Sequence, residues 1–293
     1  MVVLHDHHRD AAGAASCVVA AAAAAGKDEE TIVLAPQFLA EPDVRAHSPG
    51  RDVAFWSGGW KQGDHSLPAP GRVAYMTVSS FAAVDAIMAS LANARTFPDL
   101  RLTVVAGHSA GGQFDHRYAA ANPEPITTRY VVANPSSYLY LDDERPWSAL
   151  AGNRCDGVEP TCQGHNRYRY GLDELNAHMS AIGPVTIRNR YGQRRVTYLL
   201  GLEDDDPEHP ELDRSCAARA QGVHRLARGN AYVDHLRRHY GRDVLRGHTR
   251  IHVPGVGHCG DGMFSAPQGL RALFPPLPDP QPVGRAVTEV ALR

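Results

Sequence analysis

Short apolar runs alternate with amphipathic segments along the chain. Runs of three to five mostly apolar residues predict buried strands at residues 2–4, 31–34, 102–105, 130–133, 196–200 and 249–253. Helices are predicted where apolar residues recur at helical spacing or Ala dominates, over residues 11–25, 81–94, 111–121, 211–240 and 263–273. Strands that alternate with helices predict an α/β fold, a doubly wound and mostly parallel sheet with helices on both faces.

Three stretches fall outside this pattern. Residues 37–75 are rich in Gly, Pro, Trp and Ser and predict a long loop, which in a compact domain is usually functional. Residues 135–190 begin polar and aromatic, and we expect an insertion there that covers one edge of the sheet. Residues 275–293 are expected to form a Pro-rich tail on a single domain of residues 1–293. A strand as early as residue 2 suggests that earlier strands or a leader are missing from the sequence.

Composition and charge narrow the class of protein. The chain of 293 residues is 43% apolar and 21% charged, which is ordinary for a globular protein. Its net charge of −2 gives no basic field for nucleic acid. No apolar run is long enough for a membrane span. The Ala-rich stretch 14–26 is assigned to a helix rather than to a signal peptide, because residues 5–10 make a poor positive leader.

The five cysteines are an odd number, so at least one is unpaired. Cys155 and Cys162 lie in a stretch rich in Gly, Asn and Asp, which suits a disulfide. Such a bond would indicate an oxidising compartment, that is, a secreted or periplasmic protein rather than a cytoplasmic one. Their spacing is not one that usually binds zinc.

A nucleophile motif lies between a predicted strand and a predicted helix. Residues 107–111 read Gly-His-Ser-Ala-Gly, which fits G-x-S-x-G in the context that this motif requires. The serine of such a motif sits on a strained turn, so the residues two before and two after it must be small. We therefore expect Ser109 to be an exposed nucleophile. The following helix would aim its N-terminal amides at the reacting oxygen, with the Ala110 amide as one oxyanion donor.

A serine hydroxyl needs a base to take its proton, and sixteen histidines compete for that role. His258 lies in a Gly-rich loop directly after the last predicted strand, and the chain order of this arrangement is Ser, acid, His. His252 falls within that strand. The histidines on the Arg-rich segment 211–240 are expected to be solvated, namely His224, His235 and His239. His258 is therefore the predicted general base.

The acid is expected directly after strand 196–200, where residues 203–206 read Glu-Asp-Asp-Asp. Asp204 is the first choice because it stands three residues after the glycine that ends the strand. Asp206 is the second choice, and Glu203 and Asp205 are less favoured. The acid would fix the imidazole tautomer and stabilise the imidazolium as it forms.

Further residues are candidates for the oxyanion hole and the pocket. The second oxyanion donor should come from the loop after an early strand, here the amide of Asp6 or His7. The predicted substrate-binding residues are Gln37, Trp56, Trp60, His108, Tyr138 and Tyr140. Aromatic rings in the pocket wall would favour an apolar or aromatic substrate group, whereas the alternative for each ring is ordinary packing.

The same early loop also permits a metal interpretation. His5, His7, His8 and Asp10 resemble the clustered ligands of a metallohydrolase. The later ligands that such a site needs are not evident, and a metal mechanism would leave the serine motif unexplained. We therefore expect neither a metal nor a cofactor.

Taken together, these segments resemble the α/β-hydrolase superfamily from strand 2–4 to helix 263–273. The string GHSAGGQF at residues 107–114, with NPSSY at 134–138, is similar to a little-characterised branch of fungal and bacterial hydrolases. The resemblance implies Ser109 as nucleophile, Asp204 as acid and His258 as base. Members often carry His-Gly in the oxyanion loop where this chain has His5 and Asp6, a backbone less free to adopt positive φ.

The expected activity is hydrolysis of a carboxylic ester, small or polymeric, through an acyl-enzyme. The triad pattern leaves an amidase or peptidase and an acyltransferase open as alternatives. A binding protein that keeps the fold without catalysis is a third class, which an intact triad disfavours.

Overall fold

The computed structural model describes residues 1–47, 53–67, 77–124, 127–146 and 162–277. Its centre is a parallel sheet in the order β1-β4-β5-β6-β7. The strands are β1 (Val2–Leu4), β4 (Thr103–His108), β5 (Thr128–Ala133), β6 (Val196–Gly201) and β7 (His248–Val253). This confirms the predicted α/β fold and five of the six predicted strands.

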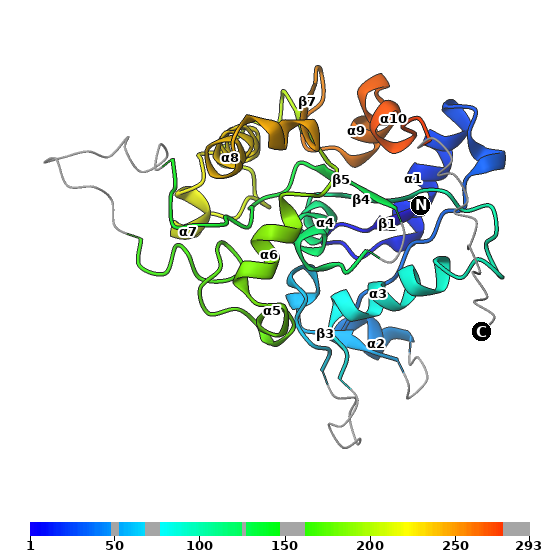
Figure 1. The fold of residues 1–293 in the computed structure, drawn as a ribbon, viewed down its shortest axis with the longest axis horizontal. Helices are drawn as coiled ribbons and strands as arrows, with labels where there is room; N and C mark the ends of the chain where they lie inside the picture. The colour runs from blue at the N-terminus through cyan, green and yellow to red at the C-terminus, as the bar shows by residue number, and fades with distance from the viewer. Residues whose placement is uncertain (48–52, 68–76, 125–126, 147–161, 278–293) are drawn as a thin grey trace, which may run out of the picture.

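Helices cover both faces of the sheet (Figure 1). α1 (Ala11–Ala24), α9 (Gly260–Ser265) and α10 (Pro267–Leu273) pack on one face. α3 (Ser80–Leu91), α4 (Ala110–Ala121), α6 (Pro184–Tyr191) and α8 (Arg225–Tyr240) contribute to the core on the other face. Alternate strand residues face the two layers, so Val2 and Leu4 lie in one cluster and Val3 in the other. The sheet is therefore doubly wound.

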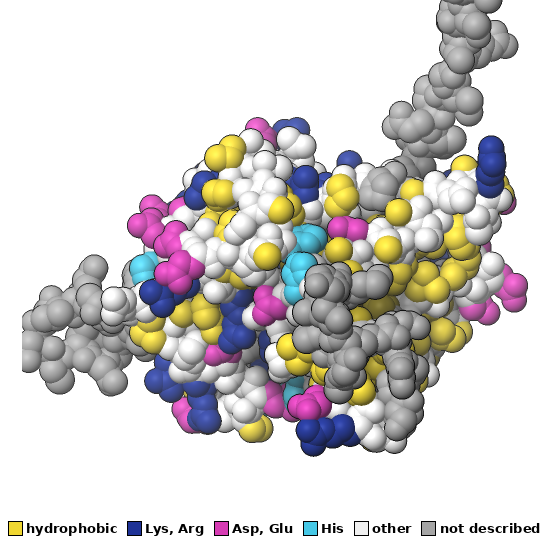
Figure 2. Space-filling view, turned by 90° about the horizontal axis from the view of Figure 1, so that it is seen from below, with side chains coloured by type: hydrophobic (Ala, Val, Ile, Leu, Met, Phe, Trp, Pro, Cys, Tyr) yellow, Lys and Arg dark blue, Asp and Glu magenta, His cyan; other side chains and the backbone are white. Residues whose placement is uncertain are grey.

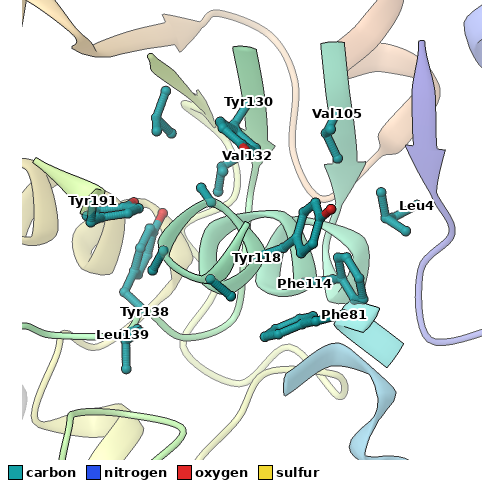
Figure 3. Packing of buried hydrophobic residues seen from close by; sticks show 14 of the residues in the cluster. Leu4, Phe81, Val105, Phe114, Tyr118, Tyr130, Val132, Tyr138, Leu139 and Tyr191 are labelled. Atoms are coloured by element: carbon teal, nitrogen blue, oxygen red, sulfur yellow. The ribbon is translucent and has the colours of Figure 1, made fainter. Parts of the chain in front are cut away.

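The central helix α4 is buried along its whole length. Phe114 and Tyr118 project from it between the sheet residues Val105 and Tyr130 and the ring of Phe81 on α3 (Figure 3). Every residue of the helix is covered, so its polar side chains need partners inside the protein.

Arg117 is the polar side chain of α4 with the most partners. Its guanidinium donates to the carbonyl oxygens of Lys61, Gln113 and Arg169 and to the hydroxyl of Ser137. These contacts attach the segments that contain Lys61, Ser137 and Arg169 to the helix that follows Ser109.

A directional hydrogen-bond chain runs through the same core. His116 Nε2 accepts from the Leu139 N–H at 2.8 Å, so the ring proton lies on Nδ1 and points at the Tyr191 hydroxyl, 2.8 Å away. The Tyr191 hydroxyl lies 2.6 Å from that of Tyr198, which in turn lies 3.0 Å from His248 Nδ1. His248 Nε2–H then donates to the Tyr191 carbonyl. His116 fits this chain only as a neutral imidazole, and His248 fits it as a neutral imidazole when the Tyr198 hydroxyl donates to its Nδ1.

Acid should therefore weaken the fold before the carboxylates titrate. Burial lowers the pKa of His248 to about 4 and holds the pKa of His116 well below its usual range. Because unfolding restores a pKa of about 6.5, their contribution is complete above that pH and is lost as the pH falls towards 4. We expect the free energy of unfolding in urea to fall by about 1.4 kcal/mol per pH unit for each histidine. His248→Gln should flatten this slope, and a slope unchanged from that of the exposed control His8→Gln would contradict the prediction.

Several elements differ from those predicted. Residues 31–34 form no strand, because only Leu34 pairs with β1, through an isolated bridge to Val2. The predicted loop 37–75 contains short elements, namely β2 (Leu39–Ala40), α2 (Glu41–His47), β3 (Phe55–Trp56) and the 3-10 helix η2 (Gly59–Gln62). Further short helices are η1 (Asp28–Glu30), α5 (Ala177–Ile182) and η4 (Arg242–Arg246).

Two predicted helices are interrupted. Segment 211–240 divides into α7 (Cys216–Arg219) and α8, and segment 263–273 divides where Pro267 begins α10. His235 was expected to be solvated and is fully buried, because it faces the segment after β5 rather than water. α6 was not predicted, since only Ile187 and Tyr191 on it are buried and they give a weak period.

A disulfide joins Cys162 to Cys216, with Cα atoms 5.8 Å apart. This corrects the expected pairing of Cys162 with Cys155, which lies outside the described residues. The two cysteines are 54 positions apart in sequence, so the bond ties the segment before α5 to α7. Residues 147–161 of the predicted insertion and 278–293 of the predicted tail also lie outside the described part.

In the described part of the chain, no helix has the length and apolar content needed to cross a membrane. On the face shown in Figure 2, exposed apolar side chains are interspersed with charged and polar groups.

Candidate active site

Ser109 lies on the turn between β4 and α4. Its φ of 56° is in the left-handed region, which a non-glycine residue adopts at a cost of about 1–3 kcal/mol. Its N–H donates to the Ala133 carbonyl at 3.0 Å, which ties the turn to β5. The G-x-S-x-G motif thus forms the strained strand-to-helix turn that the sequence predicts. Ser109 itself is only 6% exposed, so the expectation of an exposed nucleophile is wrong.

The glycines of the motif allow close approach of backbones. A Cβ at Gly107 would lie 2.4 Å from the Gly111 carbonyl carbon. A Cβ at Gly111 would lie 2.3 Å from the Leu4 carbonyl oxygen and 2.8 Å from that of His5. The start of α4 therefore packs directly against the end of β1, and this brings the loop after β1 beside Ser109.

Gly111→Ala should destabilise the protein by at least about 3 kcal/mol, the upper end of the usual cost of overpacking, because both obstructing atoms belong to the backbone. Thermal or urea unfolding would measure the loss. Gly260→Ala is a matched control, since its nearest neighbour is an ordinary contact with His108 at 3.4 Å. Equal stability of the two variants would contradict the close approach.

His258 lies in the loop after β7 and contacts two predicted site residues. Its Nε2 is 3.0 Å from Ser109 Oγ, and its Nδ1 is 2.8 Å from Asp204 Oδ2. A carboxylate accepts from Nδ1–H, which leaves the lone pair of Nε2 to accept the Ser109 hydroxyl proton. The three side chains follow β4, β6 and β7 at the carboxyl ends of the strands, where sites of such sheets lie.

Asp204 is the member of the acidic run that reaches His258. It is buried, whereas Glu203, Asp205 and Asp206 are exposed, and Asp206 instead accepts from the Glu208 N–H at 2.9 Å. The structure thus distinguishes among the four acids that the sequence left open.

Arg225, which no sequence pattern indicated, is the second partner of Asp204. Its Nη1 lies 3.3 Å from Asp204 Oδ1, and both side chains are buried. The pair balances a carboxylate that would otherwise be isolated in the core. Arg225 is one of many arginines on its segment, and no sequence pattern distinguishes it from the others.

Two further histidines flank His258. The His108 ring lies 4.5 Å from that of His258, and burial, followed by the charges of His258 and Arg225, holds the pKa of His108 well below its usual range. His209, from the segment after β6, packs edge-on at 5.0 Å. Both rings thus pack against the imidazole of His258. His209 was not predicted, because it lies in an exposed turn without a motif.

A pocket of about 670 Å³ lies beside these groups. It is lined by residues of three segments: the loop after β1 with α1, the turn at 209–211, and the start of α9. His108, His258 and Asp6 all line it. The predicted oxyanion residue Asp6 therefore shares one pocket with the candidate base, whereas the imidazole of His7 contacts Glu211 at 3.1 Å.

The other predicted substrate-binding residues lie elsewhere. Gln37 accepts from the Ala11 N–H at 3.1 Å and donates to the Arg9 carbonyl at 2.7 Å, so it fastens its own segment to the start of α1. The rings expected in the pocket wall are instead buried in the core, namely Trp56, Trp60, Tyr138 and Tyr140. Tyr138 stacks on Tyr232, and the other rings likewise pack among aromatic neighbours.

The residues of the metal interpretation are only partly brought together. His5 Nε2 accepts from the Phe38 N–H, and Asp10 caps α1. Asp6, His7 and His8 do place their donor atoms within 4.8 Å of one another. Both histidines of this trio, however, direct Nε2 at Glu211. A metal on this loop would have to replace those contacts.

No model of a known protein family and no curated protein matches the chain. Among solved structures, it is similar to poly(aspartic acid) hydrolase-1 from Sphingomonas sp. KT-1, with 25% identity and a TM-score of 0.60 over 89% of this chain and 83% of that one. It is also similar to the poly(3-hydroxybutyrate) depolymerase LpqC from Bordetella parapertussis, with 26% identity and a TM-score of 0.61 over 95% and 80%. These neighbours are hydrolases, and the parallel sheet agrees with theirs. The chain therefore has the α/β-hydrolase fold.

Proposed function

We propose that the protein is a serine hydrolase that cleaves carboxylic esters with Ser109, His258 and Asp204. The observation that carries this proposal is the hydrogen-bonded chain from Asp204 through His258 to Ser109, with contacts of 2.8 and 3.0 Å. Nucleophile, base and orienting acid at hydrogen-bond distances are the signature of nucleophilic acyl transfer. The hydrolase neighbours support the same class of reaction.

In the proposed cycle, Ser109 Oγ attacks the ester carbonyl carbon while His258 Nε2 takes the hydroxyl proton. The amide of Ala110, together with that of Asp6 or His7, would donate to the developing oxyanion. His258 then gives its proton to the leaving alkoxide. Water, activated by the same imidazole, attacks the acyl-enzyme and releases the acid and free Ser109.

Asp204 and Arg225 have supporting roles in this scheme. Asp204 accepts from His258 Nδ1–H and stabilises the imidazolium that forms in each step. Arg225 donates to the other carboxylate oxygen and opposes rotation of Asp204 away from the ring. Arg225 thus positions Asp204 without touching the reacting atoms.

An ester is the proposed substrate because an alkoxide leaves more readily than an amide anion. The two neighbours are named for different polymers, poly(aspartic acid), whose backbone links are amides, and poly(3-hydroxybutyrate), whose links are esters. The same triad could serve either bond, and an added acceptor could replace water as in an acyltransferase. We therefore propose a small or polymeric ester, with the amide and transfer reactions as alternatives.

A fluorophosphonate and a substrate panel test this proposal together. Mass spectrometry should find one adduct on Ser109, and its absence in catalytically competent protein would end the serine mechanism. p-Nitrophenyl esters of graded chain length should be cleaved faster than the matching anilides. Faster cleavage of anilides would favour the amidase, and product transfer to an added alcohol would favour the acyltransferase.

The Cys162–Cys216 bond supports an oxidising compartment for the protein. We propose a secreted or periplasmic location on this ground. Peptide mapping without reduction should recover the two cysteines in one linked peptide from native material, and free thiols at both positions would contradict the proposal.

A further inference from the structure

A second cluster of titratable side chains lies outside the pocket, where the segment after β5 packs on α8. It consists of Asp142 on that segment and of His235 and His239 on the helix. The histidines are four residues apart, so they lie on the same helix face one turn from each other. The serine mechanism uses none of the three.

The donor atoms have nearly the spacing of a metal site. Asp142 Oδ2 lies 2.8 Å from His239 Nδ1, and Asp142 Oδ1 lies 3.7 Å from His235 Nδ1. The three donor atoms all lie within 4.8 Å of one another. Tetrahedral zinc with bonds of about 2.0–2.1 Å holds its ligand atoms about 3.3 Å apart. Small side-chain adjustments would therefore bring all three onto one ion.

His235 provides an independent observation. Its side chain is 0% exposed, and its Nδ1 has no hydrogen-bond partner among the described residues although it faces Asp142. Buried polar atoms are rarely left without a partner, and an unoccupied ion site is one explanation. On its other side, Nε2 receives only a long contact of 3.4 Å from the Leu141 N–H. A metal on Nδ1 would move the ring proton to Nε2, so this contact would have to loosen.

Access from solvent suits a cation, and Asp142 supplies the negative charge that opposes the nearby Arg145 and Arg238. The side chains of Asp142 and His239 are 28% and 21% exposed, which gives an ion a path from solvent. Of the neighbouring arginines, Arg145 donates to the Asp142 backbone carbonyl, and Arg238 lies 3.9 Å from Glu144. Two imidazoles and one carboxylate form a donor set that suits Zn²⁺ and related transition metals, whereas Ca²⁺ and Mg²⁺ prefer oxygen alone.

We propose that Asp142, His235 and His239 form a zinc site that fastens the segment after β5 to α8. Water would complete the coordination. The site binds more tightly than the trio Asp6, His7 and His8, whose histidines already contact Glu211. The proposed role of the site is structural, and this proposal does not depend on the serine mechanism.

The test is a Zn²⁺ titration of the full chain, freed of metal by a chelator and competed against a chromophoric zinc indicator. The parent protein carries His7→Ala and His8→Ala, which removes the competing trio. We expect one tight site and a rise in the thermal midpoint on addition of zinc. Asp142→Asn and His239→Gln should each weaken binding by more than about 10-fold, the least effect of disturbing a metal site.

Asp143→Asn is the matched control, because it alters the neighbouring acid without touching the cluster, and it should leave zinc affinity unchanged. If Asp142→Asn fails to fold without metal, the partly exposed His239→Gln still tests the site. Its metal affinity is then measured by the visible absorption of bound Co²⁺. Absence of a tight site in the parent, or equal affinity in the parent and His239→Gln, would show that Asp142 and His239 form only a hydrogen-bonded pair.

Discussion

Replacing Ser109 by alanine is expected to lower kcat for ester hydrolysis by about 10⁶-fold, the scale on which loss of a serine nucleophile acts in triad enzymes. The hydroxyl at 3.0 Å from His258 Nε2 is the group that forms the acyl-enzyme in the proposed cycle. Without it, only the oxyanion donors and substrate binding remain, and these leave about 10³–10⁴-fold acceleration over water. Initial rates on the best p-nitrophenyl ester, with the contaminating background subtracted, measure the effect.

Two controls separate chemistry from folding in this experiment. Ser90→Ala removes a hydroxyl from an exposed position on α3 and should leave kcat unchanged. The thermal midpoint of Ser109→Ala should not fall, because alanine removes only the hydroxyl. If Ser109→Ala retained most of the parent rate, the hydrolysis would arise at another site and the proposed mechanism would be wrong.

The sequence was most informative where local geometry dictates residue type. Gly107 and Gly111 are required because any Cβ there meets backbone atoms, so the motif around Ser109 predicts the turn directly. His258 could be found because it follows the last strand and chain order restricts the choice. The sheet was also predictable, since buried parallel strands read as continuous apolar runs.

Contacts between distant segments could not be read from the same patterns. Tyr138 and Tyr140 were predicted as rings of the pocket wall, yet they pack on Tyr232, about ninety residues later. Arg225 is indistinguishable in sequence from the other arginines of its segment until the fold brings it to Asp204. Burial of this kind depends on tertiary neighbours rather than on the periodicity of apolar residues along the sequence.

The choice of disulfide partner failed for a related reason. Cys155 and Cys162 are close in sequence and share a loop-like composition, which favoured a local bond. The bond seen joins Cys162 to Cys216 because the fold places α7 beside the segment before α5. The strand predicted at 31–34 likewise has an apolar pattern, but only Leu34 of that stretch pairs with β1. An apolar run permits a strand, and hydrogen-bonded neighbours decide whether it forms.

Asp204→Asn is expected to lower kcat by about 10⁴-fold, because the amide can donate to His258 Nδ1 and thereby favours the tautomer with its proton on Nε2. That tautomer cannot accept the Ser109 proton. Asp206→Asn is the matched control, since Asp206 is exposed and contacts only its own turn, and its rate should stay near the parent value. A larger loss from Asp206→Asn than from Asp204→Asn would reverse the assignment of the acid.

The same substitution should also destabilise the protein, because it leaves the buried Arg225 without its carboxylate, a change that typically costs about 3–5 kcal/mol. A double variant, Asp204→Asn with Arg225→Met, separates the two effects. Removal of the buried cation should restore most of the free energy of unfolding, since an apolar residue of similar volume often replaces a buried ion pair without loss. The rate should remain about 10⁴-fold low, because the imidazole still lacks its acceptor. Recovery of both stability and rate in the double variant would mean that Asp204 serves the fold alone.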